Sequence, residues 1–328
     1  MYRVVTTDEL KPVIPEEAIL KEVGASLIYG DSKSEAELIE LAQDADAIIS
    51  VYARLTARVI DSLKRCQVIV RRGIGYDNVD IEAAAAKGIP VANVPDFCTE
   101  EVADHAMALL LCAARKVSTG RDQVRSGGWD FRQLLPIPAL RDCMLGLVGF
   151  GKIPRAVAKR AQGFSLKVQT SDPFIPAGLA AEHGVELVSL EELLISSDFV
   201  SIHVPLTKDT RGMFSKREFA MMKPSAVVIN TSRGPVVNEE ALREALESGK
   251  IAFAALDVMT REPPEPDNPL RGMDNVVMTP HVAWYSKRSA RVAGEAAAKE
   301  IVRVFRGYLP KSLVNPQVKA KVHLREED

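Results

Sequence analysis

Two series of short apolar runs that alternate with helix-period segments constrain the fold of this chain most strongly. The first series runs from the N-terminus to about residue 95 and includes the apolar runs 48–51 and 68–70. The second begins near residue 144 and continues to residue 257. An alternation of strands and helices predicts parallel sheets, because consecutive parallel strands need a crossover between them. We therefore expect an α/β protein with two doubly wound units.

The segments that join and follow these series are predicted to be helical. A long helical pattern opens at Thr99, which is expected to be its N-cap, and runs towards Lys116 and beyond. A last helix over 286–306 carries an apolar stripe that needs a surface to cover, and the tail from Val314 is expected to return to the N-terminal unit. The stripe consists of Val292, Ala296, Ile301, Val304 and Phe305.

Composition argues against several classes of protein. The 328 residues contain 42 Lys plus Arg against 44 Asp plus Glu, and a net charge of −2 does not attract nucleic acid or an anionic membrane. The four cysteines are far apart and form no Cys-x-x-Cys pair, so we predict no metal site and a reducing, cytoplasmic setting. The N-terminal residues lack a signal-peptide pattern, and the apolar runs are too short to span a membrane.

A dinucleotide-binding fingerprint follows the predicted strand at 145–148. Gly149 and Gly151 allow a tight turn and the close approach of a pyrophosphate, whose charge is stabilised at the N-terminus of the next helix. Pro154 stands where a third glycine is usual, and proline is tolerated in a first helical turn. Asp172 ends the next strand, where a carboxylate accepts hydrogen bonds from a ribose diol and repels a 2′-phosphate. The sequence thus predicts NAD rather than NADP as the cofactor.

Three polar segments at predicted strand ends carry the groups that the reduction of a 2-keto acid requires. Arg233 is suited to hold a carboxylate and polarise a carbonyl, and His281 is suited to donate a proton. Glu262 favours the protonated imidazole when it lies beside His281. Each of these residues alone also fits an ordinary surface loop. The interpretation therefore depends on their combination with the glycine turn, at the edge where doubly wound sheets bind ligands.

These motifs together resemble the D-isomer-specific 2-hydroxyacid dehydrogenase family. Few families share the set, and in this chain it covers most of the sequence. The motifs are the glycine turn with its distal Asp172, Thr-Ser-Arg-Gly at 231–234, Leu-Asp-Val followed by Glu-Pro at 256–263, and Thr-Pro-His at 279–281.

The resemblance implies two Rossmann-like α/β domains with an active-site cleft between them. A flavodoxin-like substrate-binding domain is expected from residues 1–98 plus 287–328, and a doubly wound NAD-binding domain from residues 99–286. The reaction implied is the NAD-dependent interconversion of a D-2-hydroxy acid and its 2-keto acid. The catalytic residues implied are Arg233, Glu262 and His281.

The same resemblance assigns further residues to the cofactor and the substrate. Lys152 and Ile153 are expected to cover the pyrophosphate, whereas His105 on the long helix is assigned to packing or hinge geometry. The expected cofactor-binding residues are Gly149, Gly151, Lys152, Ile153, Asp172, His203, Pro205, Thr210, Thr231, Ser232, Arg233, Asp257 and His281. The expected substrate-binding residues are Arg71, Gly73, Ile74, Gly75, Arg233, His281 and Trp284.

Two branches of the family offer alternatives to a general D-2-hydroxyacid dehydrogenase. The segments 94–104 and 280–286 resemble the C-terminal binding proteins, which are NAD(H)-sensing corepressor scaffolds. Arg54, Arg71 and Arg72 suit a phosphorylated or dicarboxylic acid, as in phosphoglycerate dehydrogenases, whereas Trp284 suits an apolar side chain. These opposite signals leave the 2-hydroxy acid open. The long helix at Thr99 resembles the dimer interface of the family, so a homodimer is also expected.

Overall fold

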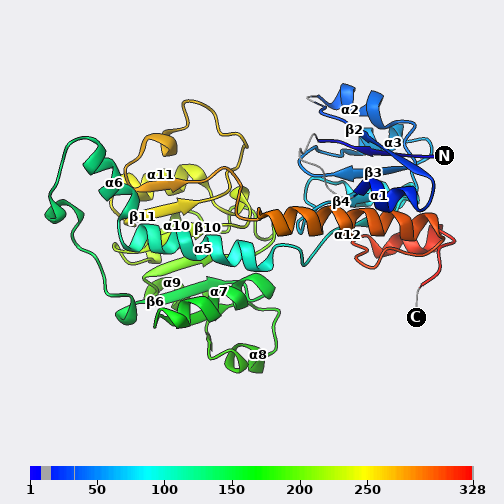
Figure 1. The fold of residues 1–328 in the computed structure, drawn as a ribbon. Helices are drawn as coiled ribbons and strands as arrows, with labels where there is room; N and C mark the ends of the chain where they lie inside the picture. The colour runs from blue at the N-terminus through cyan, green and yellow to red at the C-terminus, as the bar shows by residue number, and fades with distance from the viewer. Residues whose placement is uncertain (9–15, 33, 327–328) are drawn as a thin grey trace. The chain divides into compact units, whose positions relative to one another are not determined.

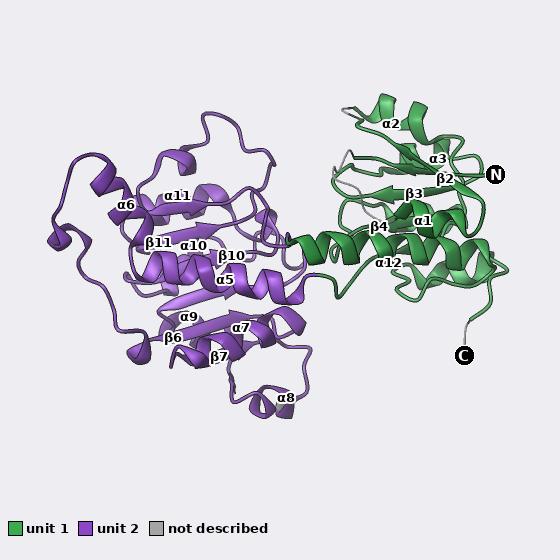
Figure 2. Ribbon diagram, viewed as in Figure 1, with its two compact units in different colours: residues 1–97, 286–328 green, residues 98–285 purple. Residues whose placement is uncertain are grey.

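The computed structural model describes residues 1–8, 16–32 and 34–326 (Figure 1), and the chain divides into two compact units (Figure 2). Unit 1 comprises residues 1–97 and 286–328, and unit 2 comprises residues 98–285. The domain boundaries expected from the sequence fall one residue from this division. Each unit contains one parallel sheet, so the predicted fold class is confirmed.

Unit 1 has a five-stranded parallel sheet in the order β2-β1-β3-β4-β5, which is the flavodoxin-like order. One face is covered by α2, α3 and α4, through a buried cluster that includes Leu38, Ile60 and Ile69, while α1 and α12 pack together on the other face. The strands are β1 Tyr2–Thr6, β2 Ala25–Tyr29, β3 Ala47–Ser50, β4 Val68–Arg71 and β5 Val91–Ala92. The helices are α1 Glu16–Lys21, α2 Glu35–Ala42, α3 Ala57–Ser62, α4 Ile81–Ala86, α12 Lys287–Phe305 and the 3₁₀ helix η5 Pro316–Lys321.

Unit 2 has a seven-stranded parallel sheet in the order β12-β11-β10-β9-β6-β7-β8, and the strand order reverses between β6 and β9. Helices α5, α7 and α8 cover one face, and α9, α10 and α11 cover the other. The strands are β6 Met144–Val148, β7 Lys167–Ser171, β8 Glu186–Leu187, β9 Phe199–Ile202, β10 Val227–Asn230, β11 Phe253–Leu256 and β12 Val276–Met278. The α-helices are α5 Thr99–Ala114, α6 Val117–Arg125, α7 Lys152–Gly163, α8 Ala177–Glu182, α9 Leu190–Ser196, α10 Lys216–Met221 and α11 Glu239–Glu247. The 3₁₀ helices are η1 Phe131–Leu134, η2 Leu140–Asp142, η3 Gly234–Val236 and η4 Pro269–Gly272.

The first helix of unit 2 differs from its prediction at both ends. Thr99 is the first helical residue rather than the N-cap, which is Cys98 and makes no side-chain capping bond. The helix ends at Ala114, because Lys116 adopts a left-handed φ of 54° and α6 begins as a separate helix after it. All of α5 belongs to unit 2. In the described part of the chain, no helix combines the length and apolar character that crossing a bilayer demands.

The C-terminal segment packs onto unit 1. Helix α12 begins and ends within one residue of the predicted bounds 286–306. The predicted stripe is partly wrong, because Val292 and Ala296 are half-buried, whereas Ala293 and Ala297 are buried. The helix therefore presents small side chains to the sheet. The tail then returns to unit 1, as predicted, and contacts β5. Its Asn315 accepts a hydrogen bond from Val91 N (2.8 Å) and donates one to the carbonyl of residue 89 (3.0 Å).

Candidate active site

The polar residues predicted from the sequence follow the carboxyl ends of the strands of unit 2. The glycine turn follows β6, Asp172 follows β7, Arg233 follows β10, Asp257 follows β11 and His281 follows β12. Because the strands are parallel, these ends lie along one edge of the sheet, and this is the edge at which doubly wound folds bind ligands. The candidate site is therefore built from loops that a single sheet positions.

The turn after β6 has the geometry of a dinucleotide site. Gly149 has a φ of 91°, and a Cβ there would lie 3.2 Å from the carbonyl oxygen of His203, so the position favours glycine. Gly151 is the N-cap of α7 with no side-chain capping bond, and a Cβ there would meet nothing within 4 Å. Space for an anion thus lies at the N-terminus of a helix. Pro154 lies in the first turn of α7, as expected.

Asp172 connects this turn to β7. Its carboxylate accepts hydrogen bonds from the backbone N–H of Phe150 (2.8 Å) and of Phe174 (2.9 Å). A carboxylate can accept about four hydrogen bonds, so Asp172 can still accept hydrogen bonds from the hydroxyls of a ribose. The residues of the turn and Asp172 therefore fit a bound NAD.

In the loop after β9, the predicted cofactor-binding residues make hydrogen bonds to the loop itself and to the end of the strand. His203 lies 2.8 Å from Ser201 Oγ through Nε2, and desolvation of the ring lowers the pKa of His203 to about 3. Thr210 Oγ1 donates to the carbonyl of Pro205 (2.6 Å) and accepts from the backbone N–H of Thr207 (2.8 Å). His203 is therefore neutral at physiological pH, and the turn 205–210 is internally held. Their contacts with a cofactor stay predictions.

The loop after β10 is organised by Asn230, which was not among the predicted site residues. Its Oδ1 accepts from the N–H (3.0 Å) and Oγ (2.8 Å) of Ser232, and its Nδ2 donates to the carbonyl of Arg233 (2.9 Å). The signal that identifies it is an Asn at a strand end two residues before a serine, which favours an Asx turn. Among the described residues, Thr231 Oγ1 is a buried hydroxyl without a partner.

The loops after β10 and β11 pack backbone to backbone. A Cβ at Gly234 would lie 1.9 Å from the carbonyl carbon of Met259, so only glycine allows this approach. The residue before this glycine is Arg233, whose Nη1 donates to the carbonyl of Ser232 (2.8 Å). The contact therefore places the arginine loop directly against the loop that contains Glu262.

The structure brings the predicted acid/base pair together. His281 Nδ1 lies 2.6 Å from Glu262 Oε2, and Glu262 Oε1 accepts the backbone N–H of Met259 (2.9 Å). One carboxylate oxygen thus holds the glutamate on its loop while the other orients the imidazole. Because a carboxylate only accepts, Nδ1 carries the shared proton, and Nε2 is the nitrogen that can exchange a proton with a ligand.

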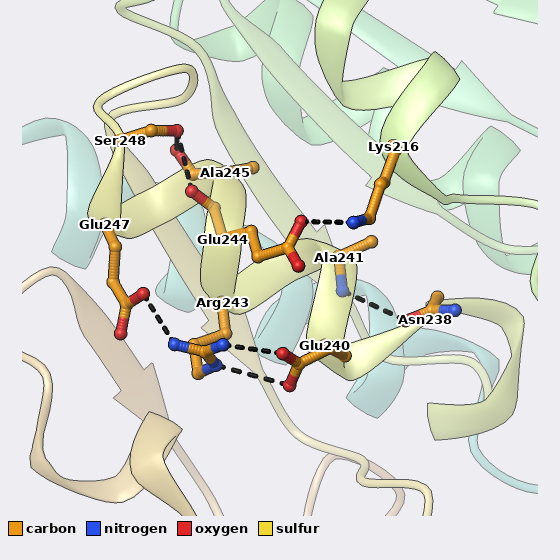
Figure 3. Close-up of polar contacts among 9 residues, drawn as sticks. All are labelled: Lys216, Asn238, Glu240, Ala241, Arg243, Glu244, Ala245, Glu247 and Ser248. Atoms are coloured by element: carbon orange, nitrogen blue, oxygen red, sulfur yellow. Dashed lines mark hydrogen bonds and ion pairs between the residues drawn. The ribbon is translucent and has the colours of Figure 1, made fainter.

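Helix α11 supports the loop that carries Glu262. Glu239, its first residue, accepts hydrogen bonds from the backbone N–H of Thr260 and from Asn268 Nδ2 (3.3 Å). The helix itself is stabilised by an N-cap and by i,i+3 and i,i+4 ion pairs. Figure 3 shows these contacts, which involve Lys216, Asn238, Glu240, Ala241, Arg243, Glu244 and Glu247.

In unit 1, the loop predicted to bind the substrate follows β4, where Arg71 ends the strand. A Cβ at Gly73 would lie 1.4 Å from Arg71 Nη1, so the guanidinium of Arg71 folds over the glycine. The carbonyl of Gly73 accepts from Val94 N (2.9 Å), and Asn93 Nδ2 donates to the carbonyl of Ile74 (2.7 Å). Backbone and amide contacts thus hold the segment 73–75 that was predicted to meet a substrate carboxylate.

The three arginines of the predicted basic group have different environments. Arg72 Nη1 lies 2.6 Å from Glu16 Oε1, and the two side chains are 5% and 1% exposed. Arg54 is exposed, and Arg71 is half-buried. Arg72 is therefore committed to a buried ion pair, which leaves two arginines for a ligand.

The remaining predicted residues lie in loops or in the first turn of α7, and all are at least partly exposed. Lys152 and Pro205 are exposed, and Ile153 and Ser232 are half-buried. Trp284 is also half-buried, and its ring meets that of the neighbouring tyrosine edge to face with centroids 5.5 Å apart. Their contacts with cofactor or substrate stay predictions.

The fold and the loops of unit 2 define a dinucleotide-binding α/β protein in which a histidine contacts a glutamate beside the arginine loop. Residues 107–283 match the family model of the D-isomer specific 2-hydroxyacid dehydrogenase, NAD binding domain. The chain belongs to this family, which confirms the resemblance seen in its motifs and the prediction of an NAD-binding domain.

Relatives of known name support this assignment. The chain is 40% identical over 289 residues to a glyoxylate reductase of Korarchaeum cryptofilum, with 87% of each chain covered. It is 40% identical over 319 residues to a D-3-phosphoglycerate dehydrogenase of Methanocaldococcus jannaschii, which covers 96% of this chain, and it spans 60% of that relative's length. The crystal structure of a D-lactate dehydrogenase from Aquifex aeolicus, complexed with NAD and lactic acid, matches with a TM-score of 0.84 at 27% identity, covering 99% of this chain and 100% of that one.

Proposed function

We propose that this chain is an NAD-dependent oxidoreductase that interconverts a D-2-hydroxy acid and its 2-keto acid. The observation that carries the proposal is the 2.6 Å contact between His281 and Glu262, on loops at the same edge of the sheet as the arginine loop and the glycine turn. Family membership and the names of the relatives support the same reaction class.

The residues of the chain have separate tasks in this mechanism. Bound NAD supplies or accepts the hydride. His281 takes the hydroxyl proton at Nε2 during oxidation and returns it to the carbonyl oxygen during reduction. Glu262 orients the ring and stabilises its positive charge, while Arg233 pairs with the substrate carboxylate and polarises the carbonyl. Arg71 and the amides of 73–75 provide further contacts to the carboxylate.

The first candidate substrate is a small 2-keto acid without a phosphoryl group. The pairing of Arg72 with Glu16 supports this choice, because it removes one cation from the group expected to bind a phosphate. The second candidate is 3-phosphohydroxypyruvate, which is favoured by the 40% identity to a D-3-phosphoglycerate dehydrogenase. Arg54, which is exposed, is the residue that such a substrate would use.

The test is NADH oxidation by the purified protein against glyoxylate, hydroxypyruvate, 3-phosphohydroxypyruvate, 2-oxoglutarate and phenylpyruvate, with NADPH as the control for cofactor choice. We expect saturable turnover of one substrate class with NADH. His281→Ala should lower kcat by about 10²- to 10⁴-fold and leave NADH binding intact, as expected for the loss of a general acid. If the protein binds NADH but turns over none of these acids, the proposed enzymatic activity is contradicted and an NAD(H)-sensing scaffold is favoured. Turnover like that of the wild type in His281→Ala contradicts the assigned acid.

We also propose that the protein is a homodimer, formed through the segment 117–135. Figure 1 shows α6 and the following loop projecting from unit 2. Trp129 and Phe131 are 88% and 72% exposed there, and an exposed apolar patch of this kind is typical of a protein interface. Light scattering should give the mass of two chains, and Trp129→Ser with Phe131→Ser should give a monomer. A wild-type monomer contradicts this proposal.

A cytoplasmic location is a further proposal. All four cysteines are free, and free thiols are typical of a reducing compartment. Fractionation of the source cells tests this location. Recovery of the protein outside the cytoplasmic fraction contradicts it.

A further inference from the structure

Helix α5 carries a histidine that reaches the loop of the acid/base residue. The helix packs across β10 and β11, and His105 Nε2 lies 2.9 Å from Thr279 Oγ1 and 3.4 Å from Asp257 Oδ1. Thr279 precedes His281 by two residues. A side chain on a helix thus contacts the loop that follows β12.

The direction of these hydrogen bonds follows from the charge of Asp257. This carboxyl group is 1% exposed, yet hydrogen bonds from His105, Thr279 and the backbone outweigh its desolvation and hold its pKa below the usual value. It is therefore a carboxylate and accepts the proton of Thr279 Oγ1 at 2.5 Å. A threonine hydroxyl has one proton, so it accepts from the histidine, and His105 Nε2 must be the donor. The chain of donors runs from His105 through Thr279 to Asp257.

Asp257 holds both sides of His281. Its Oδ1 accepts from the backbone N–H of Val282 (3.0 Å), and its Oδ2 accepts from that of Ala283 (2.9 Å). His281 lies between these contacts and Thr279, with a left-handed φ of 51°. A non-glycine residue in this region is strained and persists only when its surroundings hold it. The carboxylate and the threonine provide that hold.

We propose that His105 is a positioning residue for His281: by donating from Nε2 to Thr279, it holds loop 279–283 in the conformation that presents the acid/base histidine. The inference rests on the function proposed above. It also identifies Asp257 as a residue that organises this loop, in addition to its expected role at the cofactor. His105 acts through Thr279 and touches no reacting atom in this account.

The test uses two amides that differ by one methylene. The amide of Gln can reach the position of Nε2 in His105 and donate to Thr279, whereas the shorter amide of Asn cannot. We expect His105→Asn and His105→Leu to lower kcat by about 10- to 100-fold, because a displaced catalytic group loses its geometry. The Kd for NADH should stay within about twofold of the wild type, and His105→Gln should restore most of kcat. The matched control is His323→Leu, at an exposed histidine of unit 1.

The partner in the chain of donors gives an independent measurement. Thr279→Val should lower kcat to a similar degree, and combining it with His105→Leu should add less than about threefold, because the two substitutions break one chain. Equal activity of the Asn and Gln variants, additive losses, or a loss that lies in NADH binding overturns the inference. These outcomes test the role of His105 separately from the proposed function, because the proposed function is decided by the activity of His281→Ala. If the Leu variant does not fold, the Asn and Gln pair decides.

Discussion

Both units place an arginine and a glycine at or just after the carboxyl end of a parallel strand, but the glycines are needed for different reasons. In unit 1 the space over Gly73 is occupied by the guanidinium of Arg71. In unit 2 the space at Gly234 is occupied by the backbone of Met259. A guanidinium at the end of a flexible side chain can move aside at low cost, whereas two packed backbones cannot. Unit 2 therefore has a rigid arginine loop, and unit 1 has an adjustable arginine.

The neighbouring charges extend this contrast. In unit 1 the next residue, Arg72, points into the core and pairs with Glu16. In unit 2, Asn230 and Glu262 bind backbone groups within their own loops. Asp257 binds the backbone of the loop after β12, and Glu262 also contacts His281 of that loop. The loops of unit 2 thus hold one another, while the loop of unit 1 is tied to its own core.

The largest effect is expected from Arg72→Met, which leaves Glu16 buried without its partner. Breaking a buried pair costs about 3–5 kcal/mol of the free energy of unfolding, whereas replacing both charges is often nearly neutral. Urea denaturation should therefore show a large loss for Arg72→Met and a much smaller loss for Arg72→Met with Glu16→Leu. A loss below about 1 kcal/mol in the single variant would show that Arg72 is solvated and would return it to the group available for a ligand.

Gly234→Ala is expected to have the next largest effect, because the added Cβ forces two backbones apart. Overpacking of this kind costs about 1–3 kcal/mol, and we expect a value near the upper end together with a fall in kcat. The measurement is urea denaturation with a parallel kinetic assay. Gly249→Ala, at a helix end where no atom lies within 4 Å of the new Cβ, is the control for the loss of a glycine, although its φ of 66° adds strain of its own. Unchanged stability in Gly234→Ala contradicts the rigid loop.

Acid should weaken unit 2 through His203. The pKa of His203 is about 3 in the folded chain against about 6.5 in the unfolded chain, so the unfolded state binds a proton first as the pH falls. The contribution is fully present above pH 6.5 and decreases towards pH 3, with a loss of up to about 2 kcal/mol at pH 5. Both tryptophans, Trp129 and Trp284, lie in unit 2, so their fluorescence reports its unfolding.

The comparison for this measurement is His203→Gln, which keeps a polar group near Ser201 but does not titrate. Its stability should depend less on pH between 7 and 5 than that of the wild type. An exposed histidine, changed in His323→Gln, should leave the dependence unaltered. Equal pH dependence in all three proteins would contradict a His203 that stays neutral in the folded chain.

Gly73→Ala is expected to have the smallest effect on stability, below about 0.5 kcal/mol, because Arg71 can move aside. The displaced guanidinium should instead raise KM for the keto acid by about tenfold, which corresponds to about 1.4 kcal/mol of binding. Steady-state kinetics and urea denaturation should therefore separate the two variants. Gly73→Ala should mainly raise KM, whereas Gly234→Ala should mainly lower the free energy of unfolding. A large loss of stability in Gly73→Ala would remove the contrast between the two loops.

The parts of the site that sequence could predict are those set by local chain geometry or by chemistry. Strand, glycine turn and helix follow one another around Gly149, and this order together with the distal Asp172 predicts a dinucleotide site. The pairing of Glu262 with His281 was expected from their chemistry, although 19 residues separate them. Helix α12 begins within one residue of its predicted start because Ser286 is a strong N-cap that accepts from Ser289 N.

The parts that escaped prediction depend on distant partners. Arg72 and Glu16 are 56 residues apart, and an arginine after a strand has no local signal of burial. His105 was assigned to packing because only the folded sheet brings it to Thr279. Strands β8 and β12 have two and three residues, which are too few to show a period. The buried face of α12 follows from the shape of its sheet, which accepts Ala293 and Ala297 more closely than Val292.

The contact between Asn315 and Val91 has a consequence for synthesis on the ribosome. These residues are 224 positions apart, and all of unit 2 lies between them. All of unit 2 is therefore translated before Asn315, and until then the edge of β5 stays uncovered. Closing so long a loop is slow and entropically costly. We therefore expect unit 2 to fold first and the sheet of unit 1 to be completed last. Chaperones would then act on the nascent chain while the sheet of unit 1 is incomplete.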